Sequence, residues 1–241
     1  MTDRGRPALR RSAHTLQIGP SRVQWTGTAL QIDMDEFGAL PQLGRVRGRV
    51  TLTPAAVTDI EVALTPDNRH LWRPFAPTAR IEVALNRGVT WSGHGYFDAN
   101  FGSRALEADF RTWTWGRFPV SDGAICLYDA RRLDGSDLSL ALHIARDGTP
   151  TVVQAPPLAR LPRTPFLLAR ETRADPGCRP QQVMRLFEAP FYNRSLVRTT
   201  LFGEQTVGMH EALDLSRFRS PLMKPLLAVR VPRRRDWRFT D

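Results

Sequence analysis

The chain has 241 residues, of which 41% are hydrophobic and 24% are charged, a composition typical of a globular protein with a sizeable buried core. The formal net charge is +10, and almost all basic residues are arginine, since Lys224 is the only lysine. No apolar run reaches transmembrane length, and no nucleic-acid-binding motif accompanies the dispersed arginines. Two cysteines, Cys126 and Cys178, exclude a disulfide framework and a cysteine-based zinc site, so a reducing cytoplasm is the expected compartment.

The first half of the chain is predicted to form short β-strands separated by turn residues. Apolar and polar side chains alternate with period two, as along half-buried strands. The 19 prolines and 17 glycines are scattered, which suits many short strands joined by turns. The predicted strands cover residues 15–19, 21–25, 29–35, 44–53, 60–64 and 79–85.

The second half repeats this pattern. Residues 124–131 and 138–145 flank an Asp-Gly turn signal and are predicted to form a hairpin. Prolines make residues 156–165 a connection or an edge segment. Further strands are predicted over residues 166–173, 182–188, 195–202, 204–211 and 226–231, with a loop or short helix over 216–224. Strands at this spacing indicate an all-β barrel or sandwich.

The densest group of chemically active side chains lies in residues 91–104. Read as a strand, this segment places His94, Tyr96, Asp98 and Asn100 on one face and small or apolar residues on the other. The pattern by itself favours a half-buried strand whose polar row faces solvent. The alternative is an active-site face, which the abundance of tryptophan, tyrosine and histidine nearby supports.

A second pair with the same spacing, His70 and Trp72, lies upstream and shares a face if that segment is extended. At this point the sequence resembles the bacterial carotenoid 1,2-hydratases, the hydroxyneurosporene synthases of the lipocalin-like hydratase superfamily. The resemblance runs along nearly the whole chain, and its most specific part is the paired His-x-Trp and Tyr-x-Asp. The phrases that carry it are residues 69–77, 93–102, 113–115, 161–164 and 190–196.

The resemblance implies two tandem lipocalin-like β-barrel or sandwich units. We place the first over residues 1–92 and the second over residues 93–241. Members of the family usually have a further N-terminal segment, so the resemblance implies that the first unit is N-terminally truncated. Missing strands would leave an open barrel edge.

The resemblance also implies a reaction, the hydration of the terminal C1–C2 double bond of an acyclic carotenoid of the neurosporene or lycopene type. A proton adds to C2, a cation forms at C1 and water adds there. Asp98 is the expected acid, kept protonated by burial, with His70 as a polarising neighbour. Trp72 and Tyr96 are expected to offer π faces to the cation, each contact contributing roughly 0.5–2 kcal/mol. Alternatively, the Tyr96 hydroxyl holds the attacking water.

Other interpretations remain open. A related lipocalin-like cyclase or isomerase, or a non-catalytic carrier of a hydrophobic ligand, would have the same architecture. Without the resemblance, His70 would be interpreted as a structural histidine. No cofactor is expected, because no dinucleotide-binding motif is present, and the histidine spacing predicts no metal site. The expected partner is the apolar carotenoid, and the arginine-rich residues 231–239 suggest either a solvated tail or a peripheral contact with an anionic membrane surface.

Overall fold

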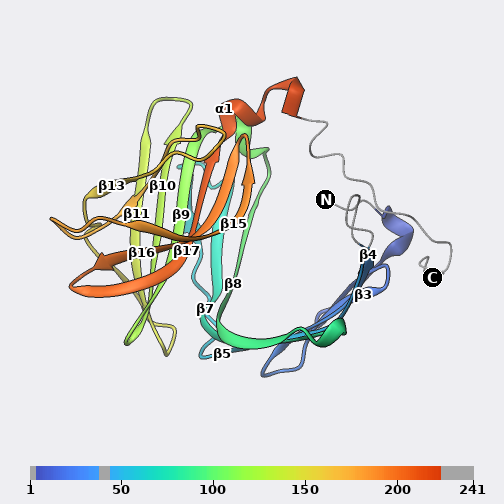
Figure 1. The fold of residues 1–241 in the computed structure, drawn as a ribbon. Helices are drawn as coiled ribbons and strands as arrows, with labels where there is room; N and C mark the ends of the chain where they lie inside the picture. Colours follow the sequence, from blue (N-terminus) through green and yellow to red (C-terminus); the bar gives the residue numbers. More distant parts are fainter. Residues whose placement is uncertain (1–3, 38–43, 224–241) are drawn as a thin grey trace. The chain divides into compact units, whose positions relative to one another are not determined.

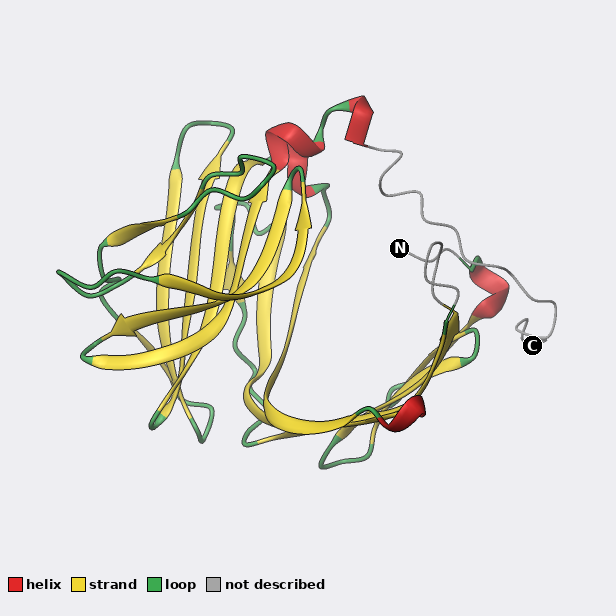
Figure 2. Ribbon diagram, viewed as in Figure 1, coloured by secondary structure: helices red, strands yellow, loops and turns green. Residues whose placement is uncertain are grey.

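The computed structural model describes residues 4–37 and 44–223, and over these ranges the chain is almost entirely antiparallel β-structure (Figures 1 and 2). This confirms the all-β class that the alternating pattern predicted. By their mutual contacts, the described residues up to 55 and residues 79–96 form a first compact unit. Residues 56–78 and 97–223 form a second. The division into residues 1–92 and 93–241 stays a prediction.

The first unit is built on a meander in which each short strand pairs antiparallel with the next. The strands are β1 (Leu9–Arg11), β2 (Thr15–Ile18), β3 (Ser21–Trp25), β4 (Leu30–Phe37) and β5 (Arg45–Pro54), preceded by the 3-10 turn η1 (Arg6–Ala8). Strands β4 and β5 carry opposite charges at facing positions, so that Arg49 Nε lies 2.7 Å from Asp33 Oδ1. The four strands predicted between residues 15 and 53 are confirmed.

Two long strands, β7 (His70–Leu85) and β8 (Thr90–Gly102), contribute residues to both units. The 3-10 turn η2 (Asn86–Gly88) connects them, and they pair with each other. The end of β7 pairs with β5, and its beginning pairs with the two-residue strand β6 (Val62–Ala63). The sequence predicted a strand only over residues 79–85, and the structure extends it back to residue 70.

The second unit is organised around a seven-stranded antiparallel sheet in the order β12-β11-β10-β9-β17-β16-β15. Its strands are β9 (Phe110–Val120), β10 (Gly123–Arg132), β11 (Asp137–Ala145), β12 (Pro150–Val152), β15 (Gln181–Ala189), β16 (Tyr192–Leu201) and β17 (Glu204–Asp214). Strands β13 (Leu158–Leu161) and β14 (Arg170–Arg173) form a separate pair. The short helical pieces are η3 (Leu106–Ala108), α1 (Leu215–Phe218) and η4 (Pro221–Met223).

The strand predicted over residues 166–173 is wrong in its first half, because only β14 is extended there. A turn centred on residues 165 and 166 occupies the rest. The backbone N–H of Leu167 donates to the Thr164 carbonyl at 2.8 Å, and that of Leu168 donates to Thr164 Oγ1 at 3.1 Å. These local bonds use the groups that a sheet ladder would need. The strand predicted over residues 226–231 lies outside the described residues.

One face of the seven-stranded sheet carries the apolar core of the second unit. The core residues are Phe118, Ile125, Leu127, Ala141, Leu161, Val197 and Leu201. Phe118 and Val197 are fully buried. Because these side chains come from β9, β10, β11, β13 and β16, the core ties the strand pair β13–β14 to the large sheet.

The same face continues into a buried polar network. The Arg170 guanidinium donates to the Pro162 carbonyl at 2.6 Å and to Asn193 Oδ1 at 2.9 Å. His210 Nε2 lies 2.8 Å from the Glu171 carbonyl, so Nε2 carries the proton. Burial lowers the pKa of His210 to about 4, which keeps the ring neutral. The network fastens β14 to β16 and β17.

We expect Leu127→Ala to lower the free energy of unfolding by about 2–5 kcal/mol, because the side chain is almost fully buried in the core. Leu186→Ala is the matched control, since Leu186 lies on β15 with 45% of its surface exposed, and it should change stability by less than about 1 kcal/mol. Urea denaturation followed by tryptophan fluorescence measures both. Equal losses for the two variants would contradict the placement of the core.

Candidate active site

The centre of the candidate site is a hydrogen bond between β7 and β8 within the second unit. Trp72 is 1% exposed, and its indole Nε1 donates to Asp98 Oδ2 at 2.8 Å. Strand pairing with β6, where Trp72 lies opposite Val62, fixes the backbone that carries the indole. Two of the four residues expected to act together are therefore in direct contact.

The environment of Asp98 favours its protonated form. Burial raises the pKa of Asp98 above the ordinary value of a carboxyl group. The hydrogen bond from Trp72 and the positive charge of Arg194 act in the opposite direction and are the smaller effects. A raised pKa keeps a carboxyl group protonated to a higher pH than usual, as a proton donor requires.

Strand β8 does not bury either of its two rows of side chains completely. Asp98 is half-buried, whereas Phe97 and Phe101 on the opposite face are each 41% exposed. Phe97 stacks on Phe75 with ring centroids 5.6 Å apart, and the Arg73 guanidinium lies over the Phe101 ring. In the row that contains Asp98, Tyr96 is also half-buried, whereas His94 and Asn100 are exposed, so only the middle of this row is sheltered.

Aromatic side chains surround the Trp72–Asp98 pair, and we call Trp72, Phe110, Trp113 and Tyr128 the aromatic cluster. The Tyr128 ring lies 5.8 Å from that of Trp72 and 5.7 Å from that of Trp113. Phe110 meets Trp113 edge to face at 6.1 Å. Burial, together with the charges of Asp98 and Glu211, raises the pKa of Tyr128 well above 10, so the phenol stays neutral. The cluster offers π faces without carrying a charge.

A second buried carboxyl group, Glu211, lies on the sheet that carries most of this cluster. Strand register places Arg194, Glu211, Trp115 and Tyr128 opposite one another on β16, β17, β9 and β10. Directly opposite residues project from the same face of a sheet. Arg194 Nε lies 3.2 Å from Glu211 Oε1.

Burial raises the pKa of Glu211, and the nearby charge of Asp98 raises it further. The charge of Arg194 and a hydrogen bond from Tyr192 lower it. The sequence did not single out Glu211, because it stands in an ordinary alternating strand. Only its pairing with the aromatic strand β9, which depends on the fold, reveals its position.

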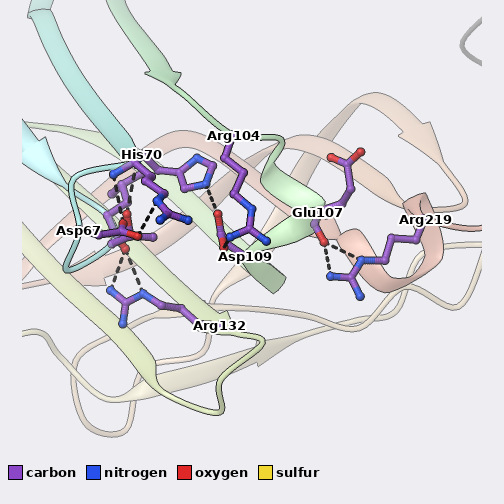
Figure 3. Close-up of polar contacts among 10 residues, drawn as sticks. Asp67, His70, Arg104, Glu107, Asp109, Arg132 and Arg219 are labelled. Atoms are coloured by element: carbon purple, nitrogen blue, oxygen red, sulfur yellow. Dashed lines mark hydrogen bonds and ion pairs between the residues drawn. The ribbon is translucent and has the colours of Figure 1, made fainter.

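His70 lies at the start of β7 and is engaged by a different carboxylate (Figure 3). Its Nε2 is 2.8 Å from Asp109 Oδ2, and Arg104 Nη1 lies 3.2 Å from Asp109 Oδ1. The His70 ring also meets Phe110 at 5.1 Å. Among the described contacts, the hydrogen-bond donor to Asp98 is Trp72 rather than His70. His70 is therefore placed to hold the start of β7 against the start of β9.

The surrounding segment is fixed by further contacts shown in Figure 3. Arg132 Nη2 donates to the Leu64 carbonyl at 2.7 Å, and the Arg219 guanidinium donates to the Glu107 carbonyl. Asp67 pairs with Arg69, whose Nε lies 2.9 Å from Asp67 Oδ2. These bonds connect the loop before β7 and the segment before β9 to the rest of the second unit.

Tyr96 and His94 belong, by their contacts, to the first unit. Tyr96 is half-buried and lies two positions before Asp98 on β8, so strand alternation directs both side chains to the same side of the strand. His94 is exposed. Cys126 is buried and free, and burial raises the pKa of its thiol to about 12.

Two hollows of about 400 and 380 Å³ open beside Trp113 in the second unit. Thr112, Trp113, Thr114 and Glu171 line both of them. The buried Trp113 Nε1 has no hydrogen-bond partner. Arginine and acidic residues make up much of the remaining lining, so these two hollows do not suit a long apolar substrate.

Over residues 4–37 and 44–223, no group of three His, Cys, Asp or Glu side chains is arranged to hold a metal ion. Within the same ranges, no helix has the length and apolar character needed to cross a membrane.

The all-β architecture defines a lipocalin-like protein, in which the half-buried Asp98 carboxyl group is hydrogen-bonded to an aromatic side chain. The whole chain, over residues 1–240, matches the model of the carotenoid hydratase CrtC family. The chain belongs to that family. This agrees with the resemblance carried by the His-x-Trp and Tyr-x-Asp pairs.

Relatives named acyclic carotenoid 1,2-hydratase match the chain throughout. The one from Cereibacter sphaeroides is 61% identical over 240 residues, and the one from Rhodobacter capsulatus is 60% identical over 242 residues. Both alignments cover 100% of this chain and 86% of the relative. A relative of the same name from Thiocapsa roseopersicina is 44% identical over 235 residues, covering 97% of this chain and 58% of its own length.

Two solved structures share the fold. An AttH protein from Nitrosomonas europaea has a TM-score of 0.55 and 14% identity, covering 85% of this chain and 70% of its own. CghA with Sch210972 has a TM-score of 0.55 and 12% identity, covering 86% of this chain and 69% of its own. They support the lipocalin-like fold that the sequence led us to expect.

We expect Trp72→Phe to raise the pKa of Asp98 further, because the indole N–H stabilises the charged carboxylate. An infrared pH titration of the buried carboxyl C=O band measures this shift, and the band is assigned by its absence in Asp98→Asn. Trp91→Phe is the control, since Trp91 is 53% exposed and belongs to the first unit. An unshifted band in Trp72→Phe would contradict the hydrogen bond.

Asp98→Asn should raise the melting temperature at pH 8. The folded-state pKa of Asp98 is raised, so its contribution to stability is fully present below the ordinary value of about 4 and is lost as the pH rises through the folded value. Asparagine keeps an acceptor for Trp72 and removes the buried charge. Scanning calorimetry should show the gain shrinking toward pH 4.

The control for this stability measurement is Asp137→Asn, whose side chain is 66% exposed and paired with Arg131 on the surface. It should change the melting temperature little at any pH in this range. If Asp98→Asn destabilises the protein equally at pH 4 and pH 8, burial of the carboxyl group does not govern its protonation.

Proposed function

We propose that the protein is an acyclic carotenoid 1,2-hydratase, a hydro-lyase that adds water across the terminal C1–C2 double bond of its substrate. The family membership supports the substrate class, and the relatives that share about 60% identity carry this name. The observation that carries the chemistry is the buried Asp98 carboxyl group, bonded to Trp72 and surrounded by aromatic rings.

In this proposal Asp98 is the general acid. An isolated alkene is a very weak base, so the acid must be protonated, positioned and shielded from water. Burial of Asp98 favours the protonated form, and the Trp72 N–H stabilises the carboxylate that remains after proton transfer. The proton adds to C2, the pair of π electrons forms the new C–H bond, and C1 becomes a tertiary cation.

The aromatic cluster would stabilise that cation. Trp72 meets the Asp98 carboxyl group through its N–H edge, and the Tyr128 ring lies 5.8 Å from the indole ring. Each cation–π contact to such a ring contributes about 0.5–2 kcal/mol. Because burial keeps the Tyr128 phenol protonated, it is no competing base for the proton on the cation. Tyr96 adds a further π face or holds the attacking water with its hydroxyl group.

His70 acts in this proposal as a positioning residue. Its pairing with Asp109 holds the start of β7, two positions before Trp72, so that the indole reaches Asp98. This differs from direct polarisation of the Asp98 proton, for which the described contacts of His70 give no support.

The alternatives fit the site less well. A carrier of a hydrophobic ligand has no use for a buried acid, which only destabilises the fold. A cyclase or isomerase would use the same acid, and product analysis distinguishes it from a hydratase. Peripheral contact with an anionic membrane through residues 231–239 also remains a proposal, because that segment lies outside the described residues.

Expression in a lycopene-producing bacterial host should yield products heavier than the substrate by one or two waters. Asp98→Asn should lower the rate by at least ~10²–10⁴-fold while leaving the folded state intact, because an amide cannot protonate an alkene. Mass analysis of the extracted carotenoids measures product, and Asp137→Asn should retain full activity. Near-normal turnover by a folded Asp98→Asn protein would rule out this acid.

The reaction in heavy water should place one deuterium at C2, because the proton comes from an acid that exchanges with solvent. Activity should fall as the pH rises through the raised pKa of Asp98, since only the protonated form is competent.

A further inference from the structure

We propose that Glu211 is the second catalytic residue of the hydration, the base that accepts a proton from the water as it attacks C1. Arg194 and Tyr192 are the positioning residues that hold its carboxylate. This inference rests on the proposed hydratase function and adds the half of the reaction that Asp98 cannot perform while it is delivering its own proton.

The geometry begins with the strand register of the second unit. Glu211 on β17 lies opposite Trp115 on β9, and Trp115 lies opposite Tyr128 on β10. The Tyr128 ring is 5.8 Å from the Trp72 ring, whose N–H is bonded to Asp98. Glu211 on β17 therefore lies on the face of the sheet that carries Trp115 and Tyr128, and it interacts electrostatically with Asp98 on β8. A double bond held against these rings would have one carboxyl group from each strand within reach.

The two carboxyl groups have different partners, and this difference assigns the role of base to Glu211 and that of acid to Asp98. Glu211 is paired with the Arg194 guanidinium at 3.2 Å and accepts a hydrogen bond from Tyr192, so its negative charge is compensated. Among the described contacts Asp98 has no ion pair, and its side-chain donor is the neutral Trp72 indole, with a further bond from its own backbone N–H.

The two groups are also electrostatically coupled, because the charge of Asp98 disfavours ionisation of Glu211. Two coupled carboxyl groups of this kind do not ionise independently. Arg194 lowers the pKa of both groups, but its direct contact is with Glu211, so a negative charge is better compensated on Glu211 than on Asp98.

The atoms balance in one turnover. The O–H bond of Asp98 breaks as the C2–H bond forms, and the cation at C1 takes a lone pair from water. The C1–O bond forms, one water O–H bond breaks, and that proton goes to the Glu211 carboxylate. The enzyme is left with ionised Asp98 and protonated Glu211. Transfer of one proton between them, through solvent or directly, restores the starting state.

The test separates proton delivery from water attack. Purified protein is incubated with lycopene in detergent micelles in heavy water, and both the hydrated product and deuterium in the recovered substrate are measured by mass spectrometry. Without a base for the water, the cation still forms and returns to alkene by losing a proton to Asp98. Glu211→Gln should therefore lose hydration by ~10²–10⁴-fold yet keep deuterium exchange into the substrate within ~10-fold of the wild type.

Asp98→Asn should lose both hydration and exchange. Glu188→Gln is the matched control, because Glu188 is also largely buried, with 14% exposure against 21% for Glu211, and also faces an arginine, with Arg185 Nε 3.7 Å away. It should keep both activities. Should Glu211→Gln fail to fold, Glu211→Asp keeps the charge beside Arg194 but shortens the side chain, and it should show the same separation in milder form.

Three results would overturn the assignment. Hydration by Glu211→Gln within ~3-fold of the wild type would mean that no base is lost. Loss of exchange together with hydration in the folded variant would make Glu211 part of proton delivery, or merely structural. Wild-type protein that neither hydrates nor exchanges lycopene would remove the proposed function itself, and the role of Glu211 with it.

Discussion

The site depends on one constraint, the exclusion of water from the Asp98 carboxyl group. The first half of β7 and the second half of β8 provide this shelter within the second unit, with Trp72 supplying the N–H that the carboxylate needs once its proton has left. A buried ionisable group opposes folding, so other interactions in the unit must offset it. The apolar core and the Arg170 network on the other face of the seven-stranded sheet are suited to that purpose.

Much of this could be predicted from the sequence, for a physical reason. Period-two alternation assigns side chains to two faces, so Tyr96 and Asp98 could be placed on one side of a strand before any fold was known. Alternation does not say which face is buried. Phe97 and Phe101 would be expected inside by hydrophobicity alone, yet each is 41% exposed, while Asp98 on the opposite face of β8 is half-buried. The resemblance placed Asp98 and Trp72 among the four candidate site residues, although it did not reveal their hydrogen bond.

The parts that could not be predicted are those that depend on which strands become neighbours. Asp109 follows His70 by 39 residues, and nothing local connects them before β7 and β9 assemble. Glu211 stands in an unremarkable strand until β17 pairs with β9. Strand order is a property of the assembled sheet. The alternating pattern of a sequence therefore indicates which face of its strand a residue occupies, but not which residues of other strands it contacts.

The second unit is also discontinuous along the chain. Residues 56–78, which carry His70 and Trp72, are separated from residues 97–223, which carry Asp98 and Tyr128, by a segment that belongs to the first unit. A single cut anywhere between them would leave the indole and the carboxyl group on different polypeptides. During synthesis, residues 56–78 of the second unit leave the ribosome before residues 79–96, which belong to the first unit. Neither unit is a continuous stretch of the chain, so neither can be moved to another protein as one uninterrupted segment. Evolution by exchange of whole domains would therefore have to transfer both units together.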